Sequence, residues 1–333
     1  MRVIFKQIKG NSGIDVWSNN LSAELVNFGV ISSVKYYPLY DAFCPYLLHL
    51  TNIHDEPHTI THSNISCGFP FKNDNPLVVT EHHIMYDPMY SNYLSQRQKI
   101  YYQLIKKYEE KSLKVADIVT CVSKYTQQRL EKILGYTDSK VIYNGIDENL
   151  FSPRTVDKSH YNIDSNKKVL LFVGNLSKRK GSDLLPQIMK KLDDDYLLIA
   201  TSGLRNYHAD SYNNIRTLGK ININDLVNIY NLCDIFIFPS RLEGFGLAIA
   251  EAMSCGKPVV TTNCSSMPEL IIDGKGGFLC EKDNINDFSS NIKLIAEDDD
   301  LKNKMGLYNR RRILDKFTLE RMAREYLKLY ESI

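Results

Sequence analysis

Two glutamates, Glu243 and Glu251, stand eight positions apart in the second half of the chain, with Gly244 and Gly246 between them. Carboxylates accept hydrogen bonds from hydroxyl groups, and glycines let the backbone approach a ligand closely. A helix that begins near these glycines offers free N–H groups and the positive end of its dipole to an anion. A nucleotide sugar carries both hydroxyls and phosphate and would satisfy both sets of groups, although a solvated pair of surface charges also fits this spacing.

The residues around these glutamates predict a strand, a turn, a helix and a second strand. Residues 235–238 are apolar, β-branched or aromatic and are stopped by Pro239, which is typical of a buried parallel strand. Residues 247–253 favour a helix that Gly256 and Pro258 end, and 259–262 start another strand. Ligands of open α/β sheets bind beyond the carboxyl ends of the strands, where Glu243 lies.

Three adjacent cations, Lys178, Arg179 and Lys180, precede Gly181. They follow a predicted buried strand over 168–174 and lead into a predicted helix over 182–192. Cations beside a glycine at a strand–helix turn suit a diphosphate. Most charge clusters are only solvated, but the position of this one after a strand favours a role in binding.

The segment around Glu243 resembles the signature of the family-4 retaining glycosyltransferases. The matching residues are Pro239-Ser240, Glu243-Gly-Phe-Gly246, Glu251 and Gly256-x-Pro-Val-Val260. The first half also resembles the family, in Ala116-Asp-x-Val-x-x-Val-Ser123 and Ile142-Tyr-Asn-Gly-Ile-Asp147. The resemblance covers nearly the whole chain and implies an α/β protein of the GT-B fold, with two facing Rossmann-like domains built on parallel sheets.

The resemblance implies a role for each donor-binding residue. Glu243 would hold sugar hydroxyls and Glu251 the ribose, while Lys180 and the backbone at Phe245, Gly246 and Leu247 would bind the diphosphate. The family's usual Arg position holds Asn175 in this chain, so we expect Arg179 to be the second cation.

The base of the nucleotide would be read by backbone near Lys220, which follows a predicted strand over 215–218. Another strand, over 196–200, ends at a glycine turn over 201–203.

Gly13 and His82 are the candidate site residues of the first half. Gly13 belongs to a glycine turn over 10–17 between a strand over 2–8 and a helix over 19–28, and in the family such a loop approaches the donor diphosphate or the acceptor. His82 ends a strand over 76–83 and takes the position of a family histidine that contacts the donor sugar, while His83 replaces the family's Asp. An ordinary turn and a structural histidine are the alternatives.

Two further stretches of the first half leave their function open. Residues 36–49 include five aromatic side chains, which fit either an acceptor platform or a loop anchored on aromatics. A predicted helix over 96–114 carries five lysines and an apolar stripe that comprises Ile100, Leu104, Ile105 and Tyr108. Such a helix can lie on an anionic membrane, or it can be an ordinary solvated helix.

Length and composition limit the number of domains and the classes of function that the chain can have. The 333 residues predict two domains, and a net charge of +2 gives no support for nucleic-acid binding. Seven cysteines without a Cys-x-x-Cys pair fit free thiols in a reducing cytosol. We expect no signal peptide, because residues 2–8 are already a predicted strand, and no apolar run approaches the ~20 residues of a membrane span. We therefore expect a cytoplasmic protein, peripheral at most to the inner face of a membrane.

The predicted domains are an acceptor-binding domain over 1–150, a linker over 151–168 that opens the second half, and a donor-binding domain over 151–317. A last helix within 318–333 is expected to pack back on the first domain. The acidic triplets 193–195 and 298–300 resemble solvated turns more than metal sites, and no metal site is predicted.

The expected activity is retaining, metal-independent transfer of a hexose-type sugar. The donor would be a UDP- or GDP-linked sugar, without a separate cofactor, and the acceptor a glycan or a lipid-linked molecule of cell-surface polysaccharide synthesis. Two other hypotheses remain: a non-catalytic subunit that binds a nucleotide sugar, and a nucleotide-sugar 2-epimerase of the same fold.

Overall fold

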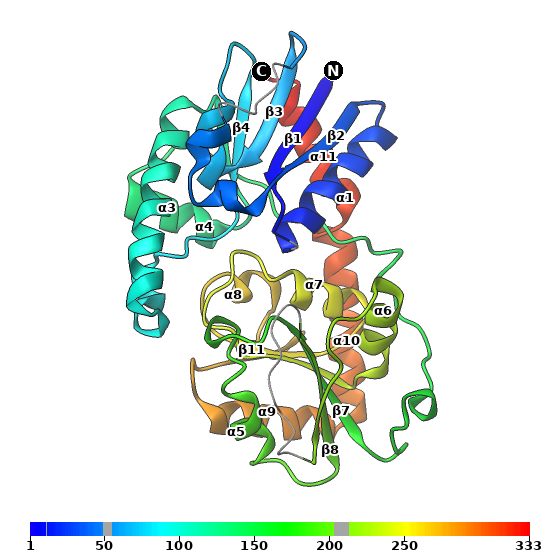
Figure 1. Cartoon of the computed structure of the whole chain (residues 1–333). Helices are drawn as coiled ribbons and strands as arrows, with labels where there is room; N and C mark the ends of the chain where they lie inside the picture. The colour runs from blue at the N-terminus through cyan, green and yellow to red at the C-terminus, as the bar shows by residue number, and fades with distance from the viewer. Residues whose placement is uncertain (11, 49–54, 203–212) are drawn as a thin grey trace. The chain divides into compact units, whose positions relative to one another are not determined.

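The computed structural model describes residues 1–10, 12–48, 55–202 and 213–333, and the chain divides into two compact units (Figure 1). Unit 1 comprises Met1–Gly145 and Leu319–Ile333, and unit 2 comprises Ile146–Thr318. Each unit contains a six-stranded sheet whose described strand pairs are parallel. The fold class is therefore α/β, as the sequence predicted. Asn11, His49 and Gly203, which belong to stretches considered above, lie outside the described residues.

Unit 1 has the strand order β2-β1-β3-β4-β5-β6. Its strands are β1 (Arg2–Ile8), β2 (Ile31–Tyr37), β3 (Thr59–Asn64), β4 (Leu77–Glu81), β5 (Ile118–Cys121) and β6 (Ser139–Val141). Its α-helices are α1 (Gly13–Asn27), α3 (Gln96–Val115), α4 (Lys124–Leu134) and α11 (Leu319–Tyr330). Short 3₁₀ helices are η1 (Leu39–Ala42), η2 (Pro45–Leu47), η3 (Ile65–Cys67), η4 (Phe69–Phe71) and η5 (Pro88–Tyr93).

The sheet of unit 1 has a hydrophobic core on each face, because successive strand residues point to opposite sides. Val78 joins the cluster formed with α1 and α11, and its neighbour Val79 joins the cluster that α3 and α4 cover (Figure 1). The C-terminal helix α11 is thus an integral part of unit 1. Hydrogen bonds add to this packing: His62 Nδ1 lies 2.6 Å from Tyr330 Oη, and His62 Nε2 lies 2.7 Å from Thr80 Oγ1.

Unit 2 has the strand order β12-β11-β10-β7-β8-β9. Its strands are β7 (Lys168–Gly174), β8 (Tyr196–Ser202), β9 (Ile215–Thr217), β10 (Ile235–Phe238), β11 (Val259–Thr262) and β12 (Gly277–Cys280). Its α-helices are α5 (Leu185–Met189), α6 (Ile223–Leu232), α7 (Leu247–Ser254), α8 (Met267–Leu270), α9 (Ile285–Ala296) and α10 (Asp299–Lys316), and its 3₁₀ helices are η6 (Lys158–Tyr161) and η7 (Lys178–Lys180).

Two predicted helices differ from those observed. Helix α1 begins at Gly13 rather than near residue 19, because Ser12 caps it and Asp15 completes a capping box. Gly13 is therefore the first helical residue and not part of a longer turn. The predicted helix over 182–192 is reduced to α5, since η7 and a left-handed Gly181 precede it and Pro186 lies in its first turn.

The predicted domain boundary and linker also need correction. Residues 146–150 belong to unit 2, where Ile146 N–H donates to Phe317 O at 2.8 Å and Ile146 pairs with Thr318 in a parallel bridge. The segment predicted to be a linker, 151–168, is part of unit 2 as well. Phe151 and Ile163 are both buried in it, and η6 interrupts it.

Among the helices of the described ranges, none is both long enough and apolar enough to cross a membrane.

Candidate active site

The candidate site of unit 2 lies where the strand order reverses. From β7 the sheet runs to β8 and β9 on one side and to β10, β11 and β12 on the other. Ligands of doubly wound sheets bind at such a switch point, beyond the carboxyl ends of the two central strands. The loop after β7 carries the cations 178–180, and the loop after β10 carries Glu243. The topology therefore makes neighbours of two motifs that are about sixty residues apart.

Close backbone contacts hold these two loops together. Arg241 N–H donates to Arg179 O at 2.8 Å, and Ser240 Oγ lies 3.0 Å from the same oxygen. Gly181 has a φ of +70°, and a Cβ at this position would lie 2.0 Å from Pro239 O. Only glycine allows both the left-handed backbone and this approach.

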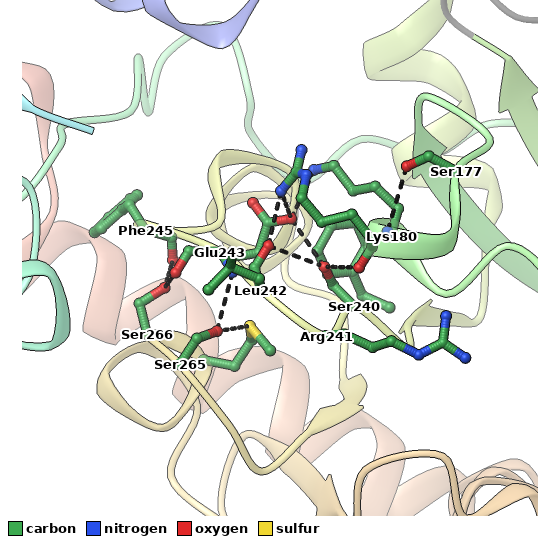
Figure 2. Close-up of polar contacts among 12 residues, drawn as sticks. Ser177, Lys180, Ser240, Arg241, Leu242, Glu243, Phe245, Ser265 and Ser266 are labelled. Atoms are coloured by element: carbon green, nitrogen blue, oxygen red, sulfur yellow. Dashed lines mark hydrogen bonds and ion pairs between the residues drawn. The ribbon is translucent and has the colours of Figure 1, made fainter. Parts of the chain in front are cut away.

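The side chains of Arg179, Lys180 and Ser240 converge on one oxygen of Glu243. Oε1 accepts from Arg179 Nη1 at 2.9 Å and from Ser240 Oγ at 2.9 Å, and it lies 3.0 Å from Lys180 Nζ. Figure 2 shows the Glu243 carboxylate directed toward Lys180 and Ser240. In the described part of the chain, Oε2 has no hydrogen-bond partner, so one carboxylate oxygen is left for a ligand.

The cations keep Glu243 ionised. Burial alone would raise the pKa of this carboxyl group, but the charges of Lys180 and Arg179 lower it to about 2. Burial lowers the pKa of Lys180, which the charge of Glu243 partly restores. The Lys180 ammonium also lies 4.7 Å from the centre of the Phe238 ring. The result is a compact charged cluster, 9% to 22% exposed by side chain, at the carboxyl edge of the sheet.

The first turn of α7 lies next to Glu243. Gly246 is the N-cap, with a φ of 101°, and no side chain caps the helix, so the N–H groups that begin at Leu247 receive no side-chain cap. The preceding loop is held by two contacts. Ser266 Oγ lies within hydrogen-bond distance of both Phe245 O (3.0 Å) and Glu243 O (3.1 Å), and the Phe245 ring packs on Phe317. The aromatic ring of Phe245 is thus a buried anchor, and only the backbone at this position can face a ligand.

Glu251 lies on the second turn of α7 beside Tyr230 of α6. The buried Tyr230 hydroxyl donates to Glu251 Oε2 at 2.7 Å. Burial raises the pKa of Glu251 to about 7, although the hydrogen bond from Tyr230 and the charge of Lys180 oppose this shift. The carboxyl group is therefore within electrostatic range of Lys180 and changes its charge near neutral pH.

Two other predicted donor-binding residues lie outside this charged cluster. Asn175 is exposed directly after β7, and Lys220 is exposed in the loop between β9 and α6. Among the described residues, the hydrogen bonds and ion pairs of Glu243 are formed with other residues.

Unit 1 carries Gly13 and His82 at the carboxyl ends of β1 and β4. Gly13 is exposed at the start of α1. His82 is 7% exposed, and its ring lies 4.7 Å from the ring of Trp17 in an edge-on arrangement. His82 Nε2 is buried without a hydrogen-bond partner in the described structure. Burial holds the pKa of His82 well below the usual value, so the imidazole is neutral. The neighbouring His83 N–H donates to Glu81 Oε1 at 2.8 Å.

The acidic triplets take part in local backbone structure. Asp193 Oδ1 accepts from Asp195 N–H, and Asp298 caps the N-terminus of α10. Within the described ranges, no group of three or more His, Cys, Asp and Glu side chains is arranged to hold a metal ion.

Two family models match the chain and follow its division into units. The family described as "Glycosyltransferase Family 4" matches residues 20–150, and the family described as "Glycosyl transferases group 1" matches residues 153–312. Together these matches include η7, the Glu243 loop and α7. The chain belongs to the family-4 glycosyltransferases.

Individual relatives and solved structures share 30% or less of their sequence with this chain. An uncharacterized glycosyltransferase of Methanocaldococcus jannaschii is 30% identical over 66% of this chain and 60% of its own. The chain thus spans about 60% of the length of this relative, and it spans the same share of the N-acetyl-alpha-D-glucosaminyl L-malate synthase of Bacillus anthracis.

Two solved structures share the GT-B fold. Sucrose-phosphate synthase of Thermosynechococcus elongatus superposes with a TM-score of 0.87 at 18% sequence identity. The superposition covers 99% of this chain and 99% of the synthase chain. Anabaena HepE, solved in complex with UDP-glucose, has a TM-score of 0.80 at 20% identity over 100% of both chains. At these identities the likeness shows the fold.

Several residues of the candidate site were not identified from the sequence. Ser240 was visible only as part of the family motif, and Tyr230 had no signal in the sequence. Arg241 was not considered at all, yet its buried guanidinium donates from Nη1 to Lys178 O and from Nη1 and Nη2 to Asp183 at 2.7 and 2.9 Å. Its Nε donates to Asp283 at 2.6 Å, and Figure 2 shows the side chain extending away from Glu243. Arg241 therefore holds the cationic turn, residues 178–180, in position.

Proposed function

We propose that the protein transfers a hexose-type sugar from a nucleotide-diphosphate sugar to a glycan or lipid-linked acceptor, with retention at the anomeric carbon and without a metal ion. The observation that carries the proposal is the convergence of Arg179, Lys180 and Glu243 at the switch point of unit 2, beside the uncapped start of α7. Cell-surface polysaccharide or glycolipid synthesis is the setting that fits this family.

The charges of the site suit a diphosphate leaving group. When the bond from the sugar to the diphosphate breaks, negative charge develops on the phosphate oxygens. Lys180 and Arg179 supply two positive charges there, and the N–H groups at the start of α7 add the positive end of a helix dipole. Since these groups neutralise the charge, the reaction needs no metal ion in this proposal.

The carboxylates suit the hydroxyl groups of the donor. Glu243 would accept hydrogen bonds from the sugar through Oε2, because its Oε1 already holds the two cations. Glu251 would accept from the ribose with Oε1, because Tyr230 occupies Oε2. His82 would contact the sugar from unit 1, and backbone near Lys220 would read the base. Anabaena HepE binds UDP-glucose, which makes this sugar nucleotide the first donor to test.

Retention would follow from front-face attack. The acceptor hydroxyl forms the new bond to the anomeric carbon on the face from which the diphosphate departs, and its proton passes to the departing phosphate oxygen. Glu243, the carboxylate nearest to the proposed sugar site, is held by two cations and has a pKa of about 2, which makes it a poor covalent nucleophile. The proposal also includes peripheral contact with a membrane, where a lipid-linked acceptor would be reached.

The test is incubation of the chain with UDP- and GDP-sugars, with and without glycan and lipid-linked acceptors, while released nucleotide and sugar product are measured. Acceptor-dependent nucleotide release with the anomeric configuration kept supports the proposal. Binding by calorimetry without release under any condition would instead show a non-catalytic subunit. Isomerised sugar without acceptor would show a 2-epimerase, and loss of activity on chelation with recovery on adding a divalent ion would overturn metal independence.

A further inference from the structure

The two cations of the candidate site are held by a carboxylate of the chain itself. Glu243 Oε1 lies 2.9 Å from Arg179 Nη1 and 3.0 Å from Lys180 Nζ. The side chain of Glu243 is 9% exposed, that of Lys180 15% and that of Arg179 22%, so solvent screens their charges only in part. Any diphosphate that binds these cations therefore meets the negative charge of Glu243 beside them.

The charge of Glu243 is fixed in both position and sign. Its backbone N–H donates to Ser265 Oγ at 3.0 Å, and its carbonyl oxygen lies 3.1 Å from Ser266 Oγ. Burial would raise the pKa of the carboxyl group, but the charges of Lys180 and Arg179 lower it to about 2, so the group is ionised at neutral pH. A bound diphosphate therefore has a permanent negative neighbour.

Free UDP and a UDP-sugar bring different charges to this neighbour. The diphosphate of a UDP-sugar is esterified at both ends and carries about two negative charges, one on each phosphate. Free UDP ends in a terminal phosphate whose second ionisation has a pKa near 6, so it carries roughly three negative charges at neutral pH. Because like charges repel strongly in a partly buried site, Glu243 weakens binding of UDP more than binding of the UDP-sugar.

The sugar also gives Glu243 a hydrogen-bond donor that free UDP lacks. Arg179, Lys180 and Ser240 all reach Oε1, and Oε2 has no hydrogen-bond partner in the part of the chain that the structure describes. A hydroxyl group of a bound sugar can donate to Oε2, and hydrogen bonds to charged groups are among the stronger ones. This bond offsets the repulsion for a UDP-sugar, whereas nothing offsets it for UDP.

We propose that Glu243 determines specificity between the two kinds of diphosphate, because it disfavours the free nucleoside diphosphate and favours the nucleotide sugar. The carboxylate is a built-in competitor for Arg179 and Lys180, and only a ligand with a sugar hydroxyl compensates it. Once the sugar has been transferred, Glu243 promotes release of the product. This inference rests on the proposed function, since it takes the two cations as the diphosphate site.

The test is calorimetry of the parent chain and of Glu243→Gln with UDP and UDP-glucose, without an acceptor, and with GDP and GDP-mannose in parallel. For the nucleotide that the parent chain binds, Glu243→Gln should bind the free diphosphate at least ~10-fold more tightly, because the like charge is gone. Affinity for the nucleotide sugar should change less than ~3-fold, since the lost repulsion and the lost hydrogen bond offset each other. A variant that has only lost structure would bind both ligands more weakly.

A second variant covers the case in which Glu243→Gln fails to fold around two unpaired cations. Glu243→Asp keeps a negative charge for Arg179 and Lys180, but its carboxylate is withdrawn by the length of one methylene group. Affinity for the free diphosphate should then rise about 3-fold. Thermal unfolding of each variant shows that a folded chain is being measured.

Glu281→Gln is the matched control for the change in charge. Glu281 is exposed directly after β12, at the same carboxyl edge of the sheet, and its substitution removes the same charge. Its affinities for both ligands should stay within ~2-fold of those of the parent chain, because solvent and salt screen an exposed charge. Unchanged or weaker binding of the free diphosphate in the Glu243 variants, or an equal gain in Glu281→Gln, would overturn the inference.

These outcomes separate the inference from the proposed function. If the parent chain binds nucleotides but never transfers a sugar, the proposed function fails, while a tighter diphosphate complex of Glu243→Gln still supports the inference. If transfer occurs and the Glu243 variants gain no affinity for the free diphosphate, the inference fails alone. Lack of binding of all four ligands to every chain would overturn both.

Discussion

The polar side chains at the carboxyl edges of the two sheets differ in how their hydrogen bonds are satisfied. In unit 2, Glu243 Oε1 takes three donors, from Arg179, Lys180 and Ser240. In unit 1, the end of β4 leaves Glu81 Oε2 and His82 Nε2 buried with no hydrogen-bond partner in the described structure. The first edge holds charges that satisfy one another, and the second holds polar atoms that nothing described satisfies.

Three buried carboxyl groups at these edges, those of Glu243, Glu81 and Glu251, differ in pKa. The pKa of Glu243 falls to about 2 because cations outweigh its burial. Burial raises the pKa of Glu81 to about 7 despite a hydrogen bond from His83 N–H, and the pKa of Glu251 to the same value. A buried polar atom without a partner costs about 1–3 kcal/mol, so a ligand that supplies the partner gains affinity. We therefore expect the edge of unit 1 to bind by hydrogen bonds alone, and that of unit 2 by its cations together with hydrogen bonds to its carboxylates.

The largest expected effect is at the charged edge. Glu243→Ala and Lys180→Ala should each lower kcat at least ~100-fold, because in the proposed function each removes a group that would act on the sugar or the leaving diphosphate. Lys178→Ala is the matched control, since Lys178 lies on the same 3₁₀ turn but its ammonium is exposed. Steady-state assays of nucleotide release measure the effect. Near-normal rates in both site variants would rule out this assignment.

A smaller loss is expected when the support behind the charged edge is removed. Arg241→Met deletes charge-assisted hydrogen bonds to Asp183, Asp283 and Lys178 O, so the cationic turn loses its position. Donor KM should rise by about 30-fold, which corresponds to roughly 2 kcal/mol, with a smaller fall in kcat.

The control for Arg241 is Arg311→Met, at an exposed position on α10. Partial recovery of KM in Arg241→Lys would support positioning by charge. An equal drop in folded fraction and activity, with unchanged KM, would show a merely structural role.

At the edge of unit 1, His82→Ala should weaken binding of the donor sugar alone. One neutral hydrogen bond is worth about 1 kcal/mol, so affinity for a UDP-sugar should fall about 5-fold while affinity for UDP stays the same. His83→Ala is the control, because His83 contributes a backbone N–H to Glu81 that the substitution keeps. Calorimetry with both ligands separates the outcomes, and an equal loss for UDP would contradict contact with the sugar.

The smallest expected effect concerns pH. Because the pKa of Glu251 is about 7 and its ionised form accepts best from ribose hydroxyls, affinity for the nucleotide should rise about 3-fold as pH increases through 7. Glu251→Gln should remove this dependence, and Tyr230→Phe should move its midpoint upward, since the Tyr230 hydroxyl lowers the pKa. A pH profile of Glu251→Gln that matches the parent chain would refute the role of Glu251.

Folding stability should change with pH in the opposite direction. The folded pKa of Glu251 is above its ordinary value of 4.5, so the stability linked to its protonated form is fully present below that value and lost as pH rises through about 7. The loss is roughly 3 kcal/mol. Denaturant unfolding at several pH values should show this slope, and Glu251→Gln should reduce it.

Short elements with local stop signals were predictable from sequence. Strands β10 and β11 have the predicted bounds, because apolar runs end there at Pro239 and Thr262. Helix α7 ends one residue beyond its predicted end, before Gly256. The predicted starts of two helices were wrong, because capping or backbone conformation decides them. The Ser12 capping box starts α1 at Gly13 rather than near residue 19, and the left-handed Gly181 delays the start of α5.

The sequence by itself determined the residue types of the site and the class of fold. Glu243, Glu251 and Lys180 are recognisable because their spacing from glycines and strand ends is local, and alternating strands and helices predict parallel sheets. Which of these residues meet was decided only by the tertiary structure. Arg179 and Glu243 are 64 positions apart and pair because β7 and β10 lie side by side.

Arg241, Tyr230 and the packing of 39–47 on α3 follow the same rule. The guanidinium of Arg241 reaches Asp183 across 58 positions, and 39–47 meets α3 through Tyr101 and Tyr108. Such contacts depend on how strands are ordered and how helices cover them, which no local pattern of residues specifies. The physical reason is that hydrogen bonds and ring contacts act within a few ångströms in space, whatever the distance along the chain.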